Sequence, residues 1–381
     1  MTMSEESIRG ALSNARTIVL KVGSALLSDP SSGLAHDLMA QWCAEIDELM
    51  SVGKRVLLVT SGAVAEGISR LGLQQRPESI HELQAAAAVG QMGLVQAYEQ
   101  AFSAHERHTA MVLLTHDDLA DRQRYLNARA TLTTLLDFNV IPVINENDSV
   151  VTDEIRFGDN DLLAALVTNL LQAELLIVLT DTDGLFEADP AVVADACFVS
   201  FAAASEAKLD TMVAGSGRLG RGGMISKLQA ARLAARGGAN TVIANGRTAH
   251  VLQRIVEGEN LGTLLSADLS PLAARKRWIA GQLKAKGELE LDAGAVRALI
   301  HSGVSLLPVG VVRVTGQFSR GELVRCLDLQ GKLIAQGLAN YSSEETQKVL
   351  GVASSDIIGR LGYSLEAELI HRDNLVVMKS G

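Results

Sequence analysis

Residues 139–161 read NVIPVINENDSVVTDEIRFGDND, and they pass from a nearly continuous apolar run into a stretch that is rich in acids. The part from Val143 to Asp161 holds six carboxylates and three asparagines in nineteen positions. Asp, Asn and Gly favour turns, so a solvated loop could carry this charge. In open α/β sheets, however, ligands bind at the carboxyl ends of the strands. The rest of the chain decides between these two interpretations.

Short apolar runs recur along the first 250 residues, at 17–23, 55–62, 109–115, 139–147, 174–181 and 240–246. A continuous apolar run is typical of a strand that helices cover on both faces. Helix-length amphipathic segments lie between most of these runs, for example at 81–105 and 227–238. This alternation predicts an α/β fold, a three-layer sandwich with a mainly parallel open sheet.

The length of 381 residues exceeds what one core usually fills, so more than one domain is expected. We predict an α/β domain at 1–265, a linker at 266–281 and a small domain at 282–381. The last segment alternates short strands with glycine-centred turns, a pattern of a small β-barrel. The basic cluster Arg275–Arg277 with Trp278 could contact nucleic acid, but we interpret it as a linker that packs between the domains.

Charge and composition exclude several classes of protein. The net charge of −10 argues against a general nucleic-acid binder, which needs a basic face. Residues 282–381 contain 11 Lys and Arg against 11 Asp and Glu, so this segment is neutral. No apolar run reaches the roughly 18 residues of a membrane span, and the N-terminus lacks a signal-peptide pattern. Cys43, Cys197 and Cys326 are scattered, which predicts reduced thiols in a cytoplasmic protein.

Polar motifs follow four of the predicted strands, and parallel strands bring them to one edge of the sheet. Glycines there let backbone N–H groups approach a ligand closely, as phosphate sites require. A second glycine-rich loop at 215–231 leads into a helix that carries Lys227, but it is not a P-loop, and no GxGxxG motif follows the first predicted strand. Lysines and carboxylates around glycine turns fit phosphoryl transfer. Lys21 is the more informative lysine, because it interrupts an apolar strand.

An ordered set of motifs resembles the glutamate 5-kinase family of the amino-acid kinase superfamily. The motifs are VLKVGS (19–24), VTSGA (59–63), DRQRYLNAR (121–129), PVINENDSV (142–150), FGDNDLLAA (157–165), LTDTDGLF (179–186) and GRGGMISKLQAA (220–231). The pair INEND and GDND separates this family from aspartate kinases and acetylglutamate kinases. The C-terminal segment resembles the PUA domain that bacterial members of the family carry.

The resemblance implies phosphorylation of the side-chain carboxylate of L-glutamate by ATP with Mg²⁺, the first step of proline biosynthesis. It implies that Lys21 and Lys227 stabilise the transferred phosphoryl group and that Asp161 orients both ammonium groups. The implied glutamate-binding residues are Ser61, Asp148 and Asn160, with Asn145 and Asn147 in the same loop. The implied ATP-binding residues are Lys21, Gly23, Ser24, Thr180, Asp181, Arg221, Gly222, Gly223, Met224, Ile225, Ser226 and Lys227. The metal ligands are not indicated.

Several interpretations stay open at this point. Arg221 replaces a threonine that is common in the family, and it could reinforce phosphate binding or point outward. Ala25 replaces a hydroxyl residue that is usual there, and Asp153 and Glu154 fit a solvated loop better than a site. A homo-oligomer and feedback inhibition by L-proline at the glutamate site are expected. The alternatives are an RNA-binding or RNA-modifying protein that uses the PUA-like domain, which the neutral charge does not favour, and a related kinase with another acidic substrate.

Overall fold

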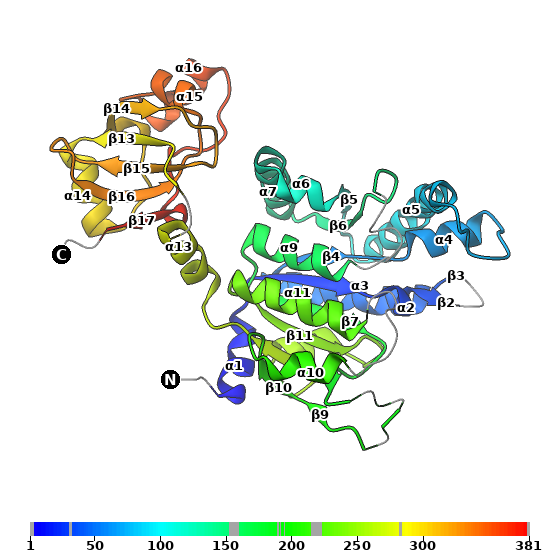
Figure 1. The fold of residues 1–381 in the computed structure, drawn as a ribbon. Helices are drawn as coiled ribbons and strands as arrows, with labels where there is room; N and C mark the ends of the chain where they lie inside the picture. Colours follow the sequence, from blue (N-terminus) through cyan, green and yellow to red (C-terminus); the bar gives the residue numbers. More distant parts are fainter. Residues whose placement is uncertain are drawn as a thin grey trace. The chain divides into compact units, whose positions relative to one another are not determined.

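A computed structural model of the chain describes residues 4–29, 33–151, 160–188, 190, 192–193, 195–214, 223–281 and 284–378. The chain divides into two compact units, Met1–Pro271 and Leu272–Gly381 (Figure 1). Of the residues discussed above, Asp153, Glu154, Arg221 and Gly222 lie outside the described ranges.

An eight-stranded sheet forms the centre of the first unit, and all neighbouring strands are parallel except one pair, β11 and β12. All six predicted strands are present in it. In spatial order the strands are β10 (Phe201–Ala203), β12 (Thr263–Ser266), β11 (Asn240–Asn245), β7 (Leu175–Thr180), β1 (Thr17–Val22), β4 (Arg55–Val59), β6 (Ile141–Glu146) and β5 (Thr109–Leu114).

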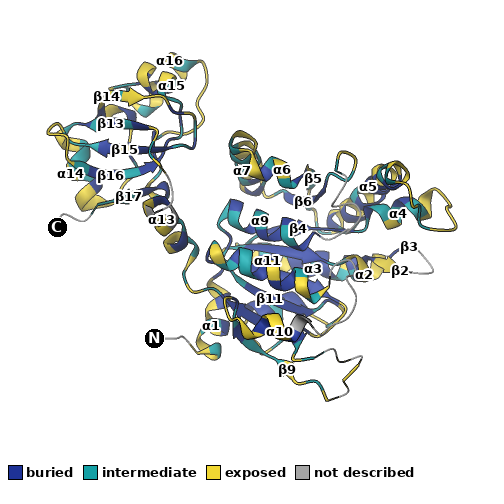
Figure 2. Ribbon diagram, in the orientation of Figure 1, coloured by how far each residue is buried: buried dark blue, intermediate teal, exposed yellow. Residues whose placement is uncertain are grey.

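Helices cover both faces of this sheet, because its strands are apolar on both sides (Figure 1). Ile18, Leu20 and Val22 of β1 point to one face, and Val19 points to the other. Figure 2 shows the central strands buried between helices whose outer surfaces are exposed. The first face packs on α3 (His36–Ser51), α5 (Ile80–Ser103) and α12 (Val251–Val256), and the second on α7 (Arg122–Asp137), α9 (Asp161–Leu171), α10 (Lys208–Ala214) and α11 (Met224–Arg236).

The remaining elements of the first unit are short. They are α1 (Glu5–Ala11), η1 (Leu12–Asn14), α2 (Ser24–Leu27), α4 (Ala63–Arg70), α6 (His116–Ala120) and the strand pairs β2 (Ser28–Asp29) with β3 (Gly33–Leu34) and β8 (Leu185–Phe186) with β9 (Phe198–Val199). Within the described ranges, none of the helices has both the length and the apolar character of a membrane span.

The second unit is built around a five-stranded sheet with a separate core. Its strand pairs are antiparallel except β13 with β15. In spatial order the strands are β14 (Val311–Gly316), β13 (Gly287–Leu291), β15 (Leu323–Leu327), β16 (Leu333–Leu338) and β17 (Leu375–Val377). The helices are α14 (Ala293–Ser302), α15 (Ser343–Lys348) and α16 (Ile357–Leu361), with 3-10 turns at Pro308–Gly310, Ser354–Asp356 and Arg372–Asn374.

The segment 266–281, predicted as a linker, contains the last residue of β12 and the helix α13 (Pro271–Gly281). Ile279 of α13 is buried against Leu323 and Leu338 of the second sheet. Gln336 donates a hydrogen bond to the backbone carbonyl of Ile279 at 2.9 Å. The end of α13 therefore packs as part of the second unit.

The predicted fold class is confirmed by the mainly parallel sheet with helices on both faces and by the separate C-terminal sheet. The parallel arrangement has a direct consequence for function. The carboxyl ends of β7, β1, β4 and β6, four adjacent strands, lie along one edge of the sheet, and most of the predicted site residues lie at these strand ends or after them.

Candidate active site

A buried cluster of three charged side chains lies on the face of the sheet that α9 and α11 cover. Lys21 of β1 contacts the Asp161 carboxylate with an Nζ–Oδ1 distance of 2.5 Å. Lys227 of α11 contacts the other carboxylate oxygen, Oδ2, at 3.1 Å. Asp161 is fully buried, and the two lysines are 2% and 4% exposed. The structure thus brings together the three residues predicted to be catalytic.

The local structure explains how these side chains meet. Lys21 lies two residues after Val19 on β1, so both side chains point to the same face of the sheet. Asp161 is the first residue of α9, and Lys227 lies in the first turn of α11. Ser226 donates a hydrogen bond from its hydroxyl to Asp161 Oδ2 at 3.0 Å. The buried cluster contains two cations and one anion, which leaves excess positive charge at this end of the sheet.

A network of amide side chains lies next to this cluster. Asn160 donates to the backbone carbonyl of Thr60 and to Asn145 Oδ1, the second at 2.5 Å. Asn145 in turn donates to Gln91 Oε1 at 3.1 Å. All of these side chains are buried, so the network holds the ends of β4, β6 and α9 in fixed positions.

A cavity of about 270 Å³ opens beside this network and contains most of the predicted glutamate-binding residues. Ser61, Asn145, Asp148 and Asn160 all line it, whereas Asn147 does not. The other described residues that line it are Ser24, Ala25, Ser28, Gly62, Ala63, Val64, Ala65 and Arg76.

Ser61 is the residue of this cavity that most directly indicates a ligand. Its side chain is buried, and its Oγ has no hydrogen-bond partner among the described residues. Buried polar atoms in native proteins are nearly always paired with protein or with ordered water. A polar group of a bound molecule in the cavity would supply the missing partner.

The residues predicted to bind ATP lie at the ends of β1 and β7 and at the start of α11. Gly23 continues the pairing of these strands, since its N–H donates to the Leu179 carbonyl at 3.1 Å. Thr180 is the last residue of β7, and its hydroxyl donates to the Asp181 carboxylate at 3.2 Å. Gly223 precedes α11, and the first-turn N–H groups of a helix have no partner within it. Met224 and Ile225 therefore present backbone donors of the kind that bind phosphate.

Two residues of this region were not predicted from the sequence, Gln91 and Tyr98 of α5. Gln91 supports Asn145, as described above. Tyr98 shares a hydrogen bond of 3.0 Å with the hydroxyl of Thr60, the residue before Ser61. Burial raises the pKa of Tyr98 well above its usual range, so the phenol stays neutral and acts as a fixed support for the end of β4.

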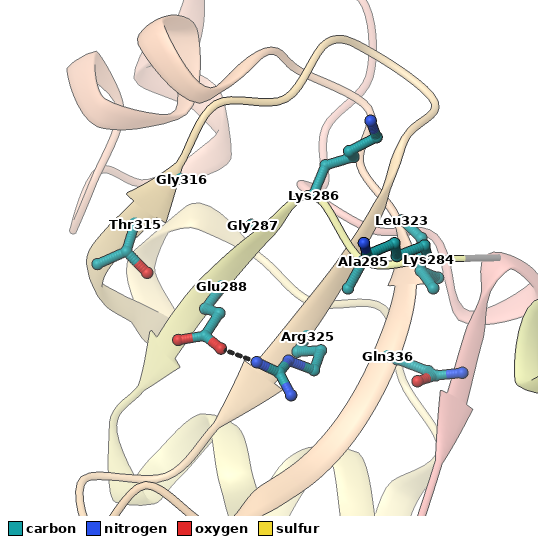
Figure 3. Close-up of a pocket in the computed structure, with 10 residues that line it drawn as sticks. All are labelled: Lys284, Ala285, Lys286, Gly287, Glu288, Thr315, Gly316, Leu323, Arg325 and Gln336. Carbon is teal, nitrogen blue, oxygen red and sulfur yellow. Dashed lines mark hydrogen bonds and ion pairs between the residues drawn. The ribbon is translucent and has the colours of Figure 1, made fainter.

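A larger cavity, of about 560 Å³, belongs to the second unit (Figure 3). It is lined by residues of β13, β14, β15 and β16 and of the segment before β13. Three of these residues are basic, Lys284, Lys286 and Arg325. Arg325 pairs with Glu288. No described residue among those predicted to be catalytic, glutamate-binding or ATP-binding lines it.

Comparison with known proteins gives matches over both units. The family model for the amino acid kinase family matches residues 16–245, and the PUA domain model matches residues 287–361. Among solved structures, carbamate kinase from Giardia lamblia bound to AMP-PNP is 19% identical with a TM-score of 0.47, covering 67% of this chain and 100% of that one. Glutamate 5-kinase from Nitrosospira multiformis is 57% identical over 97% of this chain and 100% of its own length. Glutamate 5-kinase from Thioalkalivibrio sulfidiphilus is 58% identical over 97% of this chain and 99% of its own length.

Proposed function

Because the chain belongs to the glutamate 5-kinase branch of the amino acid kinase family, we propose that it transfers the γ-phosphoryl group of ATP to the side-chain carboxylate of L-glutamate. The products are L-glutamyl 5-phosphate and ADP, and the reaction is the first step of proline biosynthesis. The observation that carries the proposal is the cavity lined by Ser61, Asn145, Asp148 and Asn160. Asn160 directly precedes the buried Asp161, which contacts two lysines. A cytoplasmic location follows from this metabolic role.

The proposed chemistry assigns one task to each part of the site. An oxygen of the glutamate side-chain carboxylate attacks the γ-phosphorus, and the bond from this phosphorus to the bridging oxygen of ADP breaks. Lys21 and Lys227 stabilise the negative charge on the phosphoryl oxygens during transfer. Asp161 is a positioning residue, because it contacts both ammonium groups and holds them in place.

Within the cavity, Asp148 suits the α-ammonium group of glutamate. The amides of Asn145 and Asn160 and the hydroxyl of Ser61 are neutral partners that do not repel the substrate's carboxylates. ATP is assigned to Gly23, Ser24, Thr180 and Asp181 and to the first turn of α11.

Mg²⁺ is expected to accompany ATP and to neutralise charge on the phosphates. The part of the chain that the structure describes contains no group of three or more His, Cys, Asp or Glu side chains that could hold a metal ion. Mg²⁺ commonly uses only one or two carboxylates and completes its coordination with water and substrate phosphates.

A substrate comparison tests the proposed function. In an ADP-release assay with Mg²⁺ and ATP, L-glutamate should be turned over, and N-acetylglutamate should have a kcat/KM lower by on the order of 10². The acetyl group removes the positive charge that Asp148 is proposed to bind. Hydroxylamine should trap the acyl phosphate product from glutamate. Equal activity on the two compounds would remove Asp148 from the ammonium role, and no turnover of glutamate would refute the function.

Proline inhibition stays a prediction that the same assay can examine. Proline shares an α-carboxylate and a charged nitrogen with glutamate, so it is expected to raise the apparent KM for glutamate. Inhibition that saturating glutamate does not relieve would point to a different binding site.

A truncated chain of residues 1–270 is expected to fold and to phosphorylate glutamate. Every residue assigned above to a substrate or to catalysis lies at or before Lys227, and the first compact unit ends at Pro271. The cut leaves β12 intact, and this strand pairs with both β10 and β11. Circular dichroism and kcat should be measured together.

A shorter chain of residues 1–262 is the matched control, since it removes β12 and should lose its folded structure. A well-folded but inactive 1–270 chain would show that the C-terminal unit completes the active site or holds an essential oligomer together. The proposed division of the chain into a catalytic and a separate C-terminal domain would then be wrong.

A further inference from the structure

We propose that Arg76 binds the α-carboxylate of glutamate and thereby selects substrates that have this group. The proposal rests on the proposed function and adds a specificity-determining residue to it. Arg76 lines the same cavity as Ser61, Asp148 and Asn160. Among the described residues that line the cavity, it is the one Lys, Arg or His side chain, and Asp148 is the one Asp or Glu.

The charges of glutamate match this lining. The substrate has two carboxylates and one ammonium group. Its side-chain carboxylate must lie toward the lysine pair, because that carboxylate accepts the phosphoryl group. Its ammonium group is assigned to Asp148, so its α-carboxylate is the one charged group that still needs a partner. A guanidinium group is well suited to this role, because it can donate two parallel hydrogen bonds to a carboxylate.

The position of Arg76 in the fold supports this role. Residues 71–75, in the connection between α4 and α5, are all exposed, whereas Arg76 is half-buried and faces the cavity. The two helices that this connection joins are packed very closely. A Cβ on Gly67 would lie 1.7 Å from the Ala86 carbonyl oxygen, and a Cβ on Gly90 would lie 1.8 Å from that of Ala63.

This close packing anchors the two helices between which the connection with Arg76 runs. Ala63 begins α4 and itself lines the cavity, immediately after Ser61 and Gly62. The connection that carries Arg76 thus begins at α4, whose first turn lines the cavity, and ends at α5, which packs closely on α4. An arginine held in this way can contribute to binding without losing much conformational freedom.

The consequence for specificity can be measured with 4-aminobutyrate. This compound is glutamate without its α-carboxylate, and its carboxylate and ammonium groups keep the same spacing. If Arg76 binds the α-carboxylate, the wild-type protein should strongly prefer glutamate, and the preference should depend on Arg76.

The test compares the full-length protein with Arg76→Ala, Arg76→Gln and Arg76→Lys. Arg76→Ala is expected to raise the KM for glutamate by about 10- to 100-fold while kcat changes by less than about threefold, the size expected for one lost hydrogen-bonded charge pair. The KM for 4-aminobutyrate, or its Ki against glutamate where turnover is too slow, should stay the same. Arg76→Lys should recover part of the loss because it keeps the charge.

Arg70→Ala is the matched control. Arg70 lies on α4 near the same connection, but it pairs with Glu66 and does not line the cavity. Arg70→Ala should leave the KM and kcat for both compounds unchanged. If Arg76→Ala does not fold, Arg76→Gln gives the same comparison with a smaller structural change.

The proposal is overturned if the Arg76 variants weaken both compounds equally, or if they leave glutamate binding unchanged. Turnover of glutamate by the wild-type protein tests the proposed function independently. If the wild-type protein phosphorylates glutamate and the Arg76 variants still prefer glutamate over 4-aminobutyrate to the same extent, only the role of Arg76 is refuted.

Discussion

Lys21→Ala and Lys227→Ala are each expected to lower kcat by on the order of 10² or more, which corresponds to about 3 kcal/mol of transition-state stabilisation. The KM for glutamate should change less, because the ammonium groups act mainly on charge that develops during transfer. Both groups are buried and contact the same carboxylate, so their positions are fixed before the reaction begins. Steady-state kinetics of ADP release gives both parameters.

The folded state should tolerate the loss of either lysine. After Lys227 is removed, Asp161 still pairs with Lys21, and the reverse holds for the other variant. No buried carboxylate is left without a cation, so a large loss of kcat would reflect chemistry and not unfolding. Thermal denaturation of each variant checks this point.

Lys208→Ala is the matched control for the two lysine variants. Lys208 also pairs with a carboxylate, that of Glu187 at 3.2 Å, but both side chains are exposed. It should leave kcat unchanged. A kcat within threefold of the wild-type value for Lys21→Ala or Lys227→Ala would assign that lysine a structural role only.

The sheet was predictable because each of its central strands is a nearly continuous apolar run. The run at 139–147 and its counterparts all became strands. The apolar runs did not predict every strand end. The run at 55–62 predicts a strand through Gly62, but β4 ends at Val59. Gly62 adopts a φ of 94°, which starts α4 and turns Ser61 toward the cavity.

The charged part of the site could be inferred from Lys21, since a lysine inside an apolar strand needs a partner. Its supporting residues could not be inferred in this way. Gln91 and Tyr98 lie in an alanine-rich helix whose pattern indicates only burial. Their partners, Asn145 and Thr60, are 54 and 38 residues away in the sequence, and no local spacing indicates these contacts.

Arg76 was also beyond the reach of sequence patterns, because it lies in a polar connection where an arginine is unremarkable. Only the folded chain places this connection beside the ends of β4 and β6, through the packing of α4 on α5. Contacts between distant segments thus account for the residues that the sequence did not indicate.

Asp161→Asn is expected to have the second large effect, on both stability and activity. Asp161 is the fully buried anion between two buried ammonium groups. Its neutralisation leaves two like charges close together without compensation, at a cost of about 3 to 5 kcal/mol in the free energy of unfolding. The melting temperature should fall by roughly 6 °C or more for a unit of this size.

The same substitution should lower kcat, because the lysines lose the carboxylate that positions them. Asp210→Asn is the matched control, since Asp210 pairs with Arg232 on the surface and lies away from the cavity. It should leave kcat unchanged and the melting temperature nearly so. An Asp161→Asn protein that is as stable and as active as the wild type would contradict the role of this residue.

A double variant separates the effect of Asp161 on stability from its effect on catalysis. In Asp161→Asn combined with Lys227→Ala, one of the two repelling charges is gone, so the double variant should be more stable than Asp161→Asn alone. Its kcat should nevertheless stay at or below that of either single variant, because a group that acts on the phosphoryl oxygens is missing. Such non-additive stability is expected when the two residues are in contact or belong to one salt-bridge network. Additive losses of melting temperature would show that the buried cluster is not electrostatically coupled, and the positioning role of Asp161 would then be untenable.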